Sequence, residues 1–226
     1  MALATNALRV AAASTLGYLL GTFPTADIVA AQAGDGDVDL RDEGSGNPGT
    51  TNALNVLGPA AGAAVLVGDI GKGALACGLG RAIGGPAGAH LAGVAAVAGH
   101  CYPVWNGFRG GKGVATSVGQ CLITFPAYFP IDVTVAVGTV VLPGLKRRAF
   151  AATAVSSLCW IVGGAVWWRR GWRNGWGPRP SALLPAAAAL TSAMIVQRFV
   201  ASESEGPASE SDGPVAETAR AARAAR

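Results

Sequence analysis

The chain carries little charge for its length. Of its 226 residues only 13% are Asp, Glu, Lys or Arg, about half the share found in ordinary soluble domains. Hydrophobic residues make up 51%, and they fall in long runs that short charged clusters separate. This pattern indicates an integral membrane protein of several apolar helices rather than a soluble globular domain. At about 20 residues per span, the length allows six or seven helices in one domain.

Residues that commonly bind metals are also scarce. The four cysteines form no CxxC pair and sit in apolar surroundings, so we interpret them as small buried residues. The two histidines, His90 and His100, lie ten residues apart, which is not a metal-ligand spacing on one helix. The net charge of +4 is dispersed and accompanies no basic and aromatic stripe. We therefore expect no metal, no cofactor and no nucleic-acid partner, and we expect the basic loops to lie beside membrane lipids.

No nucleophile stands out in the sequence. No serine lies in a GxSxG elbow, and the cysteines have no evident base beside them. The segment RGGKG is not a Walker A loop, because Lys112 is followed by Gly113 and the earlier glycine of that motif would fall on Asn106. An enzyme with this sequence is expected to bring two substrates together rather than to form a covalent intermediate.

Seven apolar runs are interpreted as membrane helices. They cover about residues 11–29, 53–68, 86–104, 114–129, 133–145, 149–168 and 181–200. The clearest is Ala149 to Trp168, which holds no charge. The first run has Arg9 as its only leading charge and no persuasive cleavage site, which favours a helix over a signal peptide. The predicted fold class is all-α, a polytopic transmembrane bundle of about seven helices.

The charges at the helix ends do not predict how the bundle is oriented in the membrane. Basic residues flank the run at 149–168 on both sides, at 146–148 and at 169–179, so the positive-inside rule gives no clear orientation. Four tryptophans lie between positions 167 and 176, as aromatic residues do at a headgroup boundary. Residues 1–200 form the predicted membrane domain. Residues 201–226 are polar and are predicted to be a disordered tail.

Three polar segments interrupt the apolar pattern, and the first is GSGNPGTTN at residues 44–52. Its glycines permit tight turns, and its Ser, Asn and Thr side chains add hydrogen-bond donors before a helix. This composition favours an anion site. An N-capping loop is the alternative, for which Thr51 or Asn52 would suffice.

The other two interruptions bring charge into apolar surroundings. Asp69 and Lys72 are three residues apart, so on a helix they share a face, either as a structural ion pair or as part of a site. In RGGKG, the cations Arg109 and Lys112 stand among glycines that let the backbone approach a ligand. Phosphate is the expected ligand there, and a basic interfacial loop that holds lipid headgroups is the alternative.

Four segments, at residues 21–28, 44–58, 69–73 and 99–116, resemble the bacterial membrane glycerol-3-phosphate acyltransferases of the PlsY type. They read GTFPTADI, GSGNPGTTNALNVLG, DIGKG and GHCYPVWNGFRGGKGVAT, and the resemblance covers about residues 16–200. It implies a seven-helix bundle in the cell membrane, with loops on the cytoplasmic side forming the site. It also implies acyl transfer from acyl phosphate to the 1-position of glycerol 3-phosphate, which gives lysophosphatidate for phospholipid synthesis.

The resemblance also suggests the site residues. The implied catalytic residues are Ser45, His100 and Lys112. The implied substrate-binding residues are Asn47, Thr51, Asn52, Asp69, Lys72, Arg109, Gly110, Gly111 and Arg198. In this scheme the glycerol hydroxyl attacks the acyl-phosphate carbonyl, phosphate leaves, and the proton goes to a phosphate oxygen or to His100. Arg109 stands where the family often has lysine, a change that keeps the charge but alters the geometry.

Several positions depart from the family pattern. Asn55 stands where the family usually has arginine, and Thr22 where it usually has serine. Ser192, Ala193 and Ile195 replace the usual His-Arg pair and asparagine of the last helix, which leaves only Arg198. Two other interpretations therefore stay open. One is a catalytically impaired paralogue that binds a phosphorylated lipid precursor, and the other is a small transporter, although no internal repeat supports a transporter.

Overall fold

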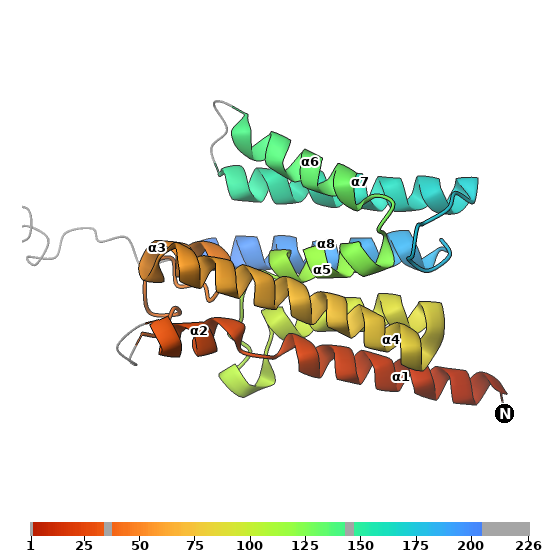
Figure 1. Cartoon of the computed structure of the whole chain (residues 1–226), viewed down its shortest axis with the longest axis horizontal. Helices are drawn as coiled ribbons and strands as arrows, with labels where there is room; N and C mark the ends of the chain where they lie inside the picture. Colours follow the sequence, from red (N-terminus) through yellow and green to blue (C-terminus); the bar gives the residue numbers. More distant parts are fainter. Residues whose placement is uncertain (1, 34–37, 143–146, 205–226) are drawn as a thin grey trace, which may run out of the picture.

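The structure, a computed structural model, describes residues 2–33, 38–142 and 147–204 (Figure 1). This part of the chain contains α-helices and one short 3₁₀ helix, and no strand. The elements are α1 (Ala2–Gly21), α2 (Thr25–Ala33), α3 (Thr50–Leu57), α4 (Pro59–Cys101), η1 (Val104–Asn106), α5 (Val114–Thr124), α6 (Phe129–Val141), α7 (Arg148–Arg170) and α8 (Leu183–Ser204). The predicted all-α class is confirmed.

Helix α4 is two antiparallel segments joined at Gly85. This residue has φ 64° and ψ −154°, a conformation that only glycine adopts readily, and Pro86 begins the second segment. A Cβ added to Gly80 would lie 2.5 Å from the carbonyl oxygen of Gly88, so the segments touch beside the turn. The chain therefore crosses the bundle twice within α4, and the second segment ends beside Asp69, since His100 Nδ1 lies 3.6 Å from Asp69 Oδ1.

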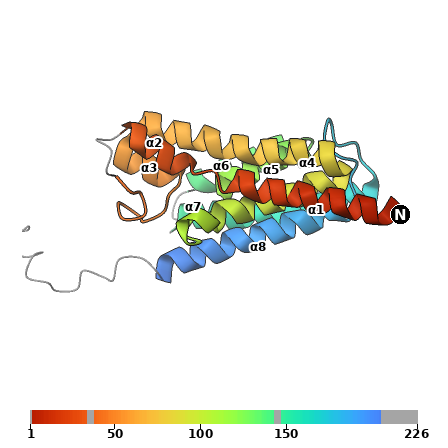
Figure 2. The same ribbon diagram turned by 90° about the horizontal axis from the view of Figure 1, so that it is seen from below.

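Small residues bring the neighbouring helices close to α4. A Cβ added to Gly17 of α1 would lie 2.4 Å from the carbonyl oxygen of Ala92, and one added to Gly119 of α5 would lie 2.0 Å from that of Ile70. Any side chain at these positions would push the helices apart. Figures 1 and 2 show α1, α4, α5 and α8 side by side, while α6 and α7 form a hairpin against α8.

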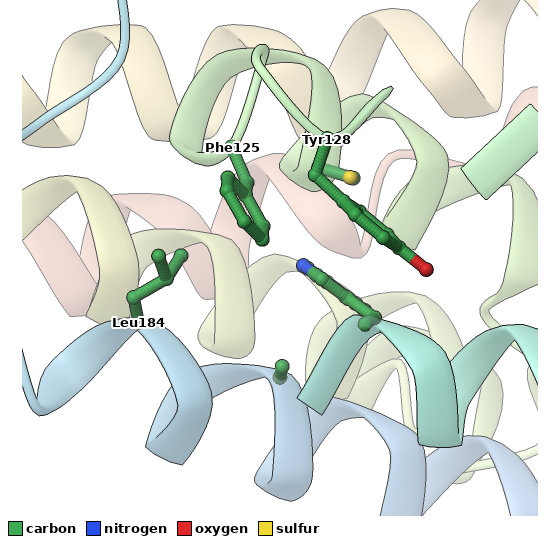
Figure 3. Close-up of a cluster of buried hydrophobic side chains, with 6 residues drawn as sticks. Phe125, Tyr128 and Leu184 are labelled. Atoms are coloured by element: carbon green, nitrogen blue, oxygen red, sulfur yellow. The ribbon is translucent and has the colours of Figure 1, made fainter. Parts of the chain in front are cut away.

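A buried apolar cluster attaches that hairpin to the bundle (Figure 3). Its members are Cys121, Phe125, Tyr128, Trp160, Leu184 and Ala188, from α5, the α5–α6 connection, α7 and α8. The Phe125 and Tyr128 rings stack with centroids 5.0 Å apart. Within the described residues, three stretches are long and apolar enough to cross a membrane, Pro59–Asn106, Arg148–Arg170 and Leu183–Ser202.

The expected first helix is broken. The sequence predicted one run over residues 11–29, but α1 ends at Gly21 and α2 begins at Thr25. Pro24 explains the break, because it has no N–H to donate and disfavours helical geometry at Phe23. At the break, the carbonyl oxygen of Phe23 accepts hydrogen bonds from the N–H of Thr25 at 2.9 Å and from Lys72 Nζ at 3.2 Å.

The second expected helix begins and ends elsewhere. The sequence predicted a run over 53–68 that stops before Asp69, but α3 is short and α4 carries both Asp69 and Lys72 inside a continuous helix. Helix α5 ends at Thr124, five residues before the expected end of its run. Helix α8 continues to Ser204, and the rest of the expected tail lies outside the described residues.

Candidate active site

A cavity lies at the end of the bundle where the α1–α2 break meets the open end of the α4 hairpin. It encloses about 310 Å³, including the space at its mouth. The break contributes residues 21–27, α4 contributes Asp69, Lys72, Gly99 and His100, and the loops contribute Arg41, Pro48, Pro103, Asn106, Gly110 and Gly111. Broken helices and glycine-rich backbone are tolerated at membrane depth where they line such a space.

Three buried ionisable side chains of α4 line this cavity. Lys72 Nζ lies 2.9 Å from Asp69 Oδ1, and the same oxygen lies 3.6 Å from His100 Nδ1. The exposed fractions of these side chains are 8% for Lys72, 3% for Asp69 and 7% for His100. The sequence left open whether Asp69 and Lys72 form an internal ion pair or part of a site. In the structure they form an internal ion pair that also lines the cavity.

The RGGKG loop wraps around His100. The N–H of Gly111 donates to the carbonyl oxygen of His100 at 3.1 Å, and a Cβ added to Gly111 would lie 2.2 Å from His100 Nε2. A Cβ added to Gly110 would lie 2.1 Å from the His100 carbonyl oxygen. Both glycines are therefore required by the closeness of the loop to the histidine, as well as lining the cavity.

The two glycine-rich loops meet, as expected for two substrates that must react together. The position of a Cβ on Gly111 is 3.1 Å from the carbonyl oxygen of Pro48, and both residues line the cavity. Helix α8 holds the second loop from the other side. Arg198 donates from Nη2 to the carbonyl oxygen of Gly110 at 2.8 Å and from Nε to that of Gly111 at 3.3 Å.

Lys112 lies just behind the cavity lining rather than in it. Its Nζ stands 4.5 Å from the centroid of the Phe199 ring. Burial and the nearby charge of Arg198 lower the pKa of Lys112. In the described part of the chain, no carboxylate forms an ion pair with Lys112 or Arg198. The Lys112 ammonium therefore has no acidic partner among the described residues, which leaves it available to an anion.

The first glycine-rich loop uses its asparagine for its own folding. Asn52 is 2% exposed. Its Oδ1 accepts from the N–H of Ser45 at 2.9 Å, and its Nδ2 donates to the carbonyl oxygens of Leu40 and Glu43 at 2.8 and 2.9 Å. Ser45 and Thr51 are exposed, Asn47 is half-buried, and none of the three lines the cavity. Their substrate roles stay predictions, and the part of this motif at the cavity is Pro48.

Sequence reasoning missed a polar network at the cavity. Asp27 accepts hydrogen bonds from Arg41 Nη1 and Nη2 at 2.8 and 3.1 Å, and from Asn106 Nδ2 at 3.0 Å. Arg41 Nε donates to the carbonyl oxygen of Arg109 at 3.1 Å. Asp27 thus connects α2 with Arg41, which precedes the first glycine-rich loop, and through Arg41 with Arg109 of the second. An acid inside an apolar run was the available signal, but its partner Arg41 is fourteen residues away.

The positions that depart from the family pattern have different surroundings. Asn55 is exposed on α3. Ile195 is buried in an apolar cluster with Val97, Cys101 and Phe199. Thr22 lines the cavity, and its hydroxyl accepts a hydrogen bond from the indole N–H of Trp105 at 3.1 Å.

Known relatives share the sequence over most of this bundle. Residues 11–202 match the family described as glycerol-3-phosphate acyltransferase. A glycerol-3-phosphate acyltransferase of Jannaschia sp. (strain CCS1) is 43% identical over 155 residues, which are 68% of this chain and 75% of the relative. One of Exiguobacterium sibiricum is 51% identical over 114 residues, 50% of this chain and 54% of the relative. The chain thus spans about half the length of some curated relatives and three quarters of others.

Two crystal structures share the fold. Both are of PlsY (YgiH), an integral membrane glycerol 3-phosphate acyltransferase. The glycerol 3-phosphate form matches with a TM-score of 0.67 and 29% identity over 85% of this chain and 88% of that chain. The lysophosphatidic acid form matches with a TM-score of 0.65 and 27% identity, over 84% and 87%. The sequence motifs, the helical bundle and these matches agree, so the chain is a multi-pass integral membrane protein that belongs to the PlsY-type glycerol-3-phosphate acyltransferase family.

Proposed function

We propose that the protein transfers a fatty acyl group from acyl phosphate to the 1-position of glycerol 3-phosphate, which gives lysophosphatidate and inorganic phosphate. The observation that carries this proposal is the meeting of two glycine-rich loops at one cavity lined by Arg41, Lys72 and His100. Membership of the family and the glycerol 3-phosphate and lysophosphatidic acid forms of the PlsY structures support it.

The proposed reaction is a direct displacement. The glycerol hydroxyl oxygen attacks the carbonyl carbon, its new C–O bond replaces the bond to phosphate, and its proton passes to a phosphate oxygen or to His100. Acyl phosphate is a mixed anhydride and is already activated, so positioning of the reactants and stabilisation of the leaving phosphate suffice. Lys112 and Arg198, two cations without an acidic partner among the described residues, are the proposed phosphate contacts.

The active site is proposed to face the cytoplasm from the plasma membrane. Charged phosphorylated substrates do not cross an apolar bilayer unaided, so the site is expected to open to the compartment that makes them. Ser45 is exposed on the first glycine-rich loop. A Ser45→Cys variant should react with a membrane-impermeant maleimide in inside-out vesicles and not in intact cells. Labelling in intact cells would reverse the proposed orientation.

One assay separates the enzyme from an impaired paralogue that binds without turnover. The exposed Asn55 and the buried Ile195, at positions where the family usually has arginine and asparagine, favour the paralogue. Phosphate release from palmitoyl phosphate by purified protein is measured with and without glycerol 3-phosphate. Release that depends on glycerol 3-phosphate and yields lysophosphatidate supports the acyltransferase. Binding of either compound without release supports the paralogue.

Asp27→Asn is expected to lower kcat/KM about tenfold with little loss of stability. The change weakens charge-assisted bonds to Arg41 that contribute about 1.5–3 kcal/mol at most, and the Asp27 side chain is 35% exposed, which reduces the effect on folding. Steady-state kinetics and thermal unfolding in detergent measure the two effects. Asp39→Asn is the matched control, because Asp39 also pairs with Arg41, at 3.1 Å, but is 48% exposed. Equal losses in both variants would contradict a positioning role for Asp27.

The KM for acyl phosphate is expected to rise at alkaline pH. Burial and the charge of Arg198 lower the pKa of Lys112, so its ammonium loses the proton at a lower pH than an exposed lysine does. The neutral amine attracts phosphate less, and KM should increase as pH rises through that pKa. KM is measured from about pH 7 to about pH 10 with correction for spontaneous hydrolysis. Lys112→Arg, which stays protonated, should not show this rise. A persistent rise in that variant would assign the titration to another group.

A further inference from the structure

The end of the bundle opposite the cavity gathers exposed arginines. The N-terminus of α1, the turn of α4 and the α7–α8 connection meet there, at the right of Figure 1. The exposed arginines are Arg9, Arg81, Arg169, Arg170, Arg173 and Arg179, here called the arginine end. Arg9 lies beside the turn, since a Cβ added to Gly84 would be 3.3 Å from its carbonyl oxygen. Arg81 donates from Nη1 to the carbonyl oxygen of Trp176, which joins α4 to the connection.

No acidic side chain of the described residues balances this charge. The acids outside the helix interiors lie in α2, in the loop at 38–49 or at the end of α8. Asp69 is fifteen residues before Gly84 on α4, which is roughly 22 Å along a helix. Asp132 bonds to Ser156, fourteen residues and roughly 21 Å before Arg170. These distances exceed the screening length of about 8 Å at physiological salt.

The α7–α8 connection is fixed in place by its own contacts. Asn174 is 5% exposed, and its Nδ2 donates to the carbonyl oxygens of Thr124 and Pro178 at 2.9 and 2.8 Å. The indole N–H of Trp176 donates to the carbonyl oxygen of Leu122 at 3.2 Å. These bonds fix the backbone that carries Arg173 and Arg179, which reduces the backbone entropy lost when the loop binds a ligand.

Exposed indoles surround these arginines. Trp168, Trp172 and Trp176 are 41%, 47% and 64% exposed, and such rings lie at headgroup depth in a bilayer. Arg169 and Arg170 end α7, where cations also stabilise a helix C-terminus. That structural role accounts for neither Arg173 nor Arg179. One guanidinium group can bind two phosphate oxygens at once, and a phosphodiester headgroup carries such oxygens at this depth.

We propose that the arginine end is a binding site for anionic phospholipid headgroups, on the membrane face opposite the catalytic cavity. The ligand class is a phosphodiester with net negative charge, such as phosphatidylglycerol. A zwitterionic lipid fits less well, because its ammonium group meets an end where the described residues offer no acid. The site uses none of the cavity residues, so it is independent of the proposed acyl transfer.

The test counts bound lipid on the purified full chain. The protein in neutral detergent is titrated with dioleoyl phosphatidylglycerol or dioleoyl phosphatidylcholine and examined by native mass spectrometry. Arg173→Gln with Arg179→Gln is expected to bind phosphatidylglycerol about thirtyfold more weakly, at about a factor of five per arginine. Arg147→Gln with Arg148→Gln removes two exposed arginines at the start of α7 and is the matched control, with an expected change under threefold.

Each outcome bears on the proposal. The proposal is supported if the Arg173→Gln, Arg179→Gln variant loses phosphatidylglycerol binding selectively and keeps a normal thermal unfolding midpoint. Wild-type protein that binds phosphatidylcholine equally well overturns it, and so does an equal loss in the control. If the glutamine variant fails to fold, lipid binding is measured instead for a variant with lysine at both positions, and for the wild type in about 0.5 M NaCl. A phosphatidylglycerol preference that survives this salt would overturn the proposal, and one that the lysine variant keeps and salt removes would support it.

Discussion

Asp69→Ala is expected to lower the free energy of unfolding by about 3–5 kcal/mol, the usual cost of removing one partner from a buried ion pair. The Asp69 and Lys72 side chains are 3% and 8% exposed and lie 2.9 Å apart. Without the carboxylate, the Lys72 ammonium stays buried with a hydrogen bond to the Phe23 carbonyl oxygen but without its ion-pair partner. Equilibrium unfolding by sodium dodecyl sulfate in mixed micelles measures the loss.

A double variant separates the structural part of this pair from the functional part. Asp69→Leu with Lys72→Met removes both charges and keeps similar volumes, so stability should return to within about 1–2 kcal/mol of wild type. Acyl transfer should stay at least about tenfold below wild type, because Lys72 also lines the cavity. A stable double variant with near-normal turnover would make the pair purely structural. A single alanine variant as stable as wild type would show that the pair is not buried in solution.

The fold was predictable where one residue type decides the local structure. Long runs with little or no charge require a helix in a bilayer, because the backbone has no other source of hydrogen bonds there, and this reasoning located α7 and α8. Charge inside a run misled the prediction. Asp69 and Lys72 suggested the end of a helix, yet they pair within α4 and the helix continues. The break at Pro24 was foreseeable from its missing N–H, but the apolar residues around it hid the signal.

The sequence predicted which motifs form the candidate site better than it predicted the role of each side chain within them. His100, Asp69, Lys72, Gly110 and Gly111, which the family resemblance suggested as site residues, line the cavity. The identity of a polar residue in a motif does not reveal whether its side chain faces a ligand or the backbone. The buried amide of Asn52, for example, bonds to the backbone of Leu40, Glu43 and Ser45. Likewise, the bonds from Asp27 to Arg41 and Asn106 depend on tertiary proximity, which a single sequence does not encode locally.

Lys112→Ala is expected to lower acyl transfer by about one to two orders of magnitude. A charge-assisted contact with substrate phosphate contributes about 1.5–3 kcal/mol, and each 1.36 kcal/mol is tenfold in rate. The structure supports this contact, because Lys112 stands beside Arg198 with no acid to pair with it in the described chain. Lysophosphatidate formation from palmitoyl phosphate and glycerol 3-phosphate measures the effect in detergent, with thermal unfolding as the check on folding.

Two further variants give this prediction its controls. Lys112→Arg should rescue only part of the activity, because the guanidinium keeps the charge and the contact with the Phe199 ring but is bulkier than ammonium. Arg148→Gln removes an exposed cation outside the glycine-rich loops and should leave turnover within about twofold of wild type. A basic loop that merely holds lipid headgroups predicts near-normal turnover for Lys112→Ala as well. An alanine variant within about twofold of an active wild type would therefore exclude the phosphate contact, and a folded but inactive wild type would favour the paralogue that binds without turnover.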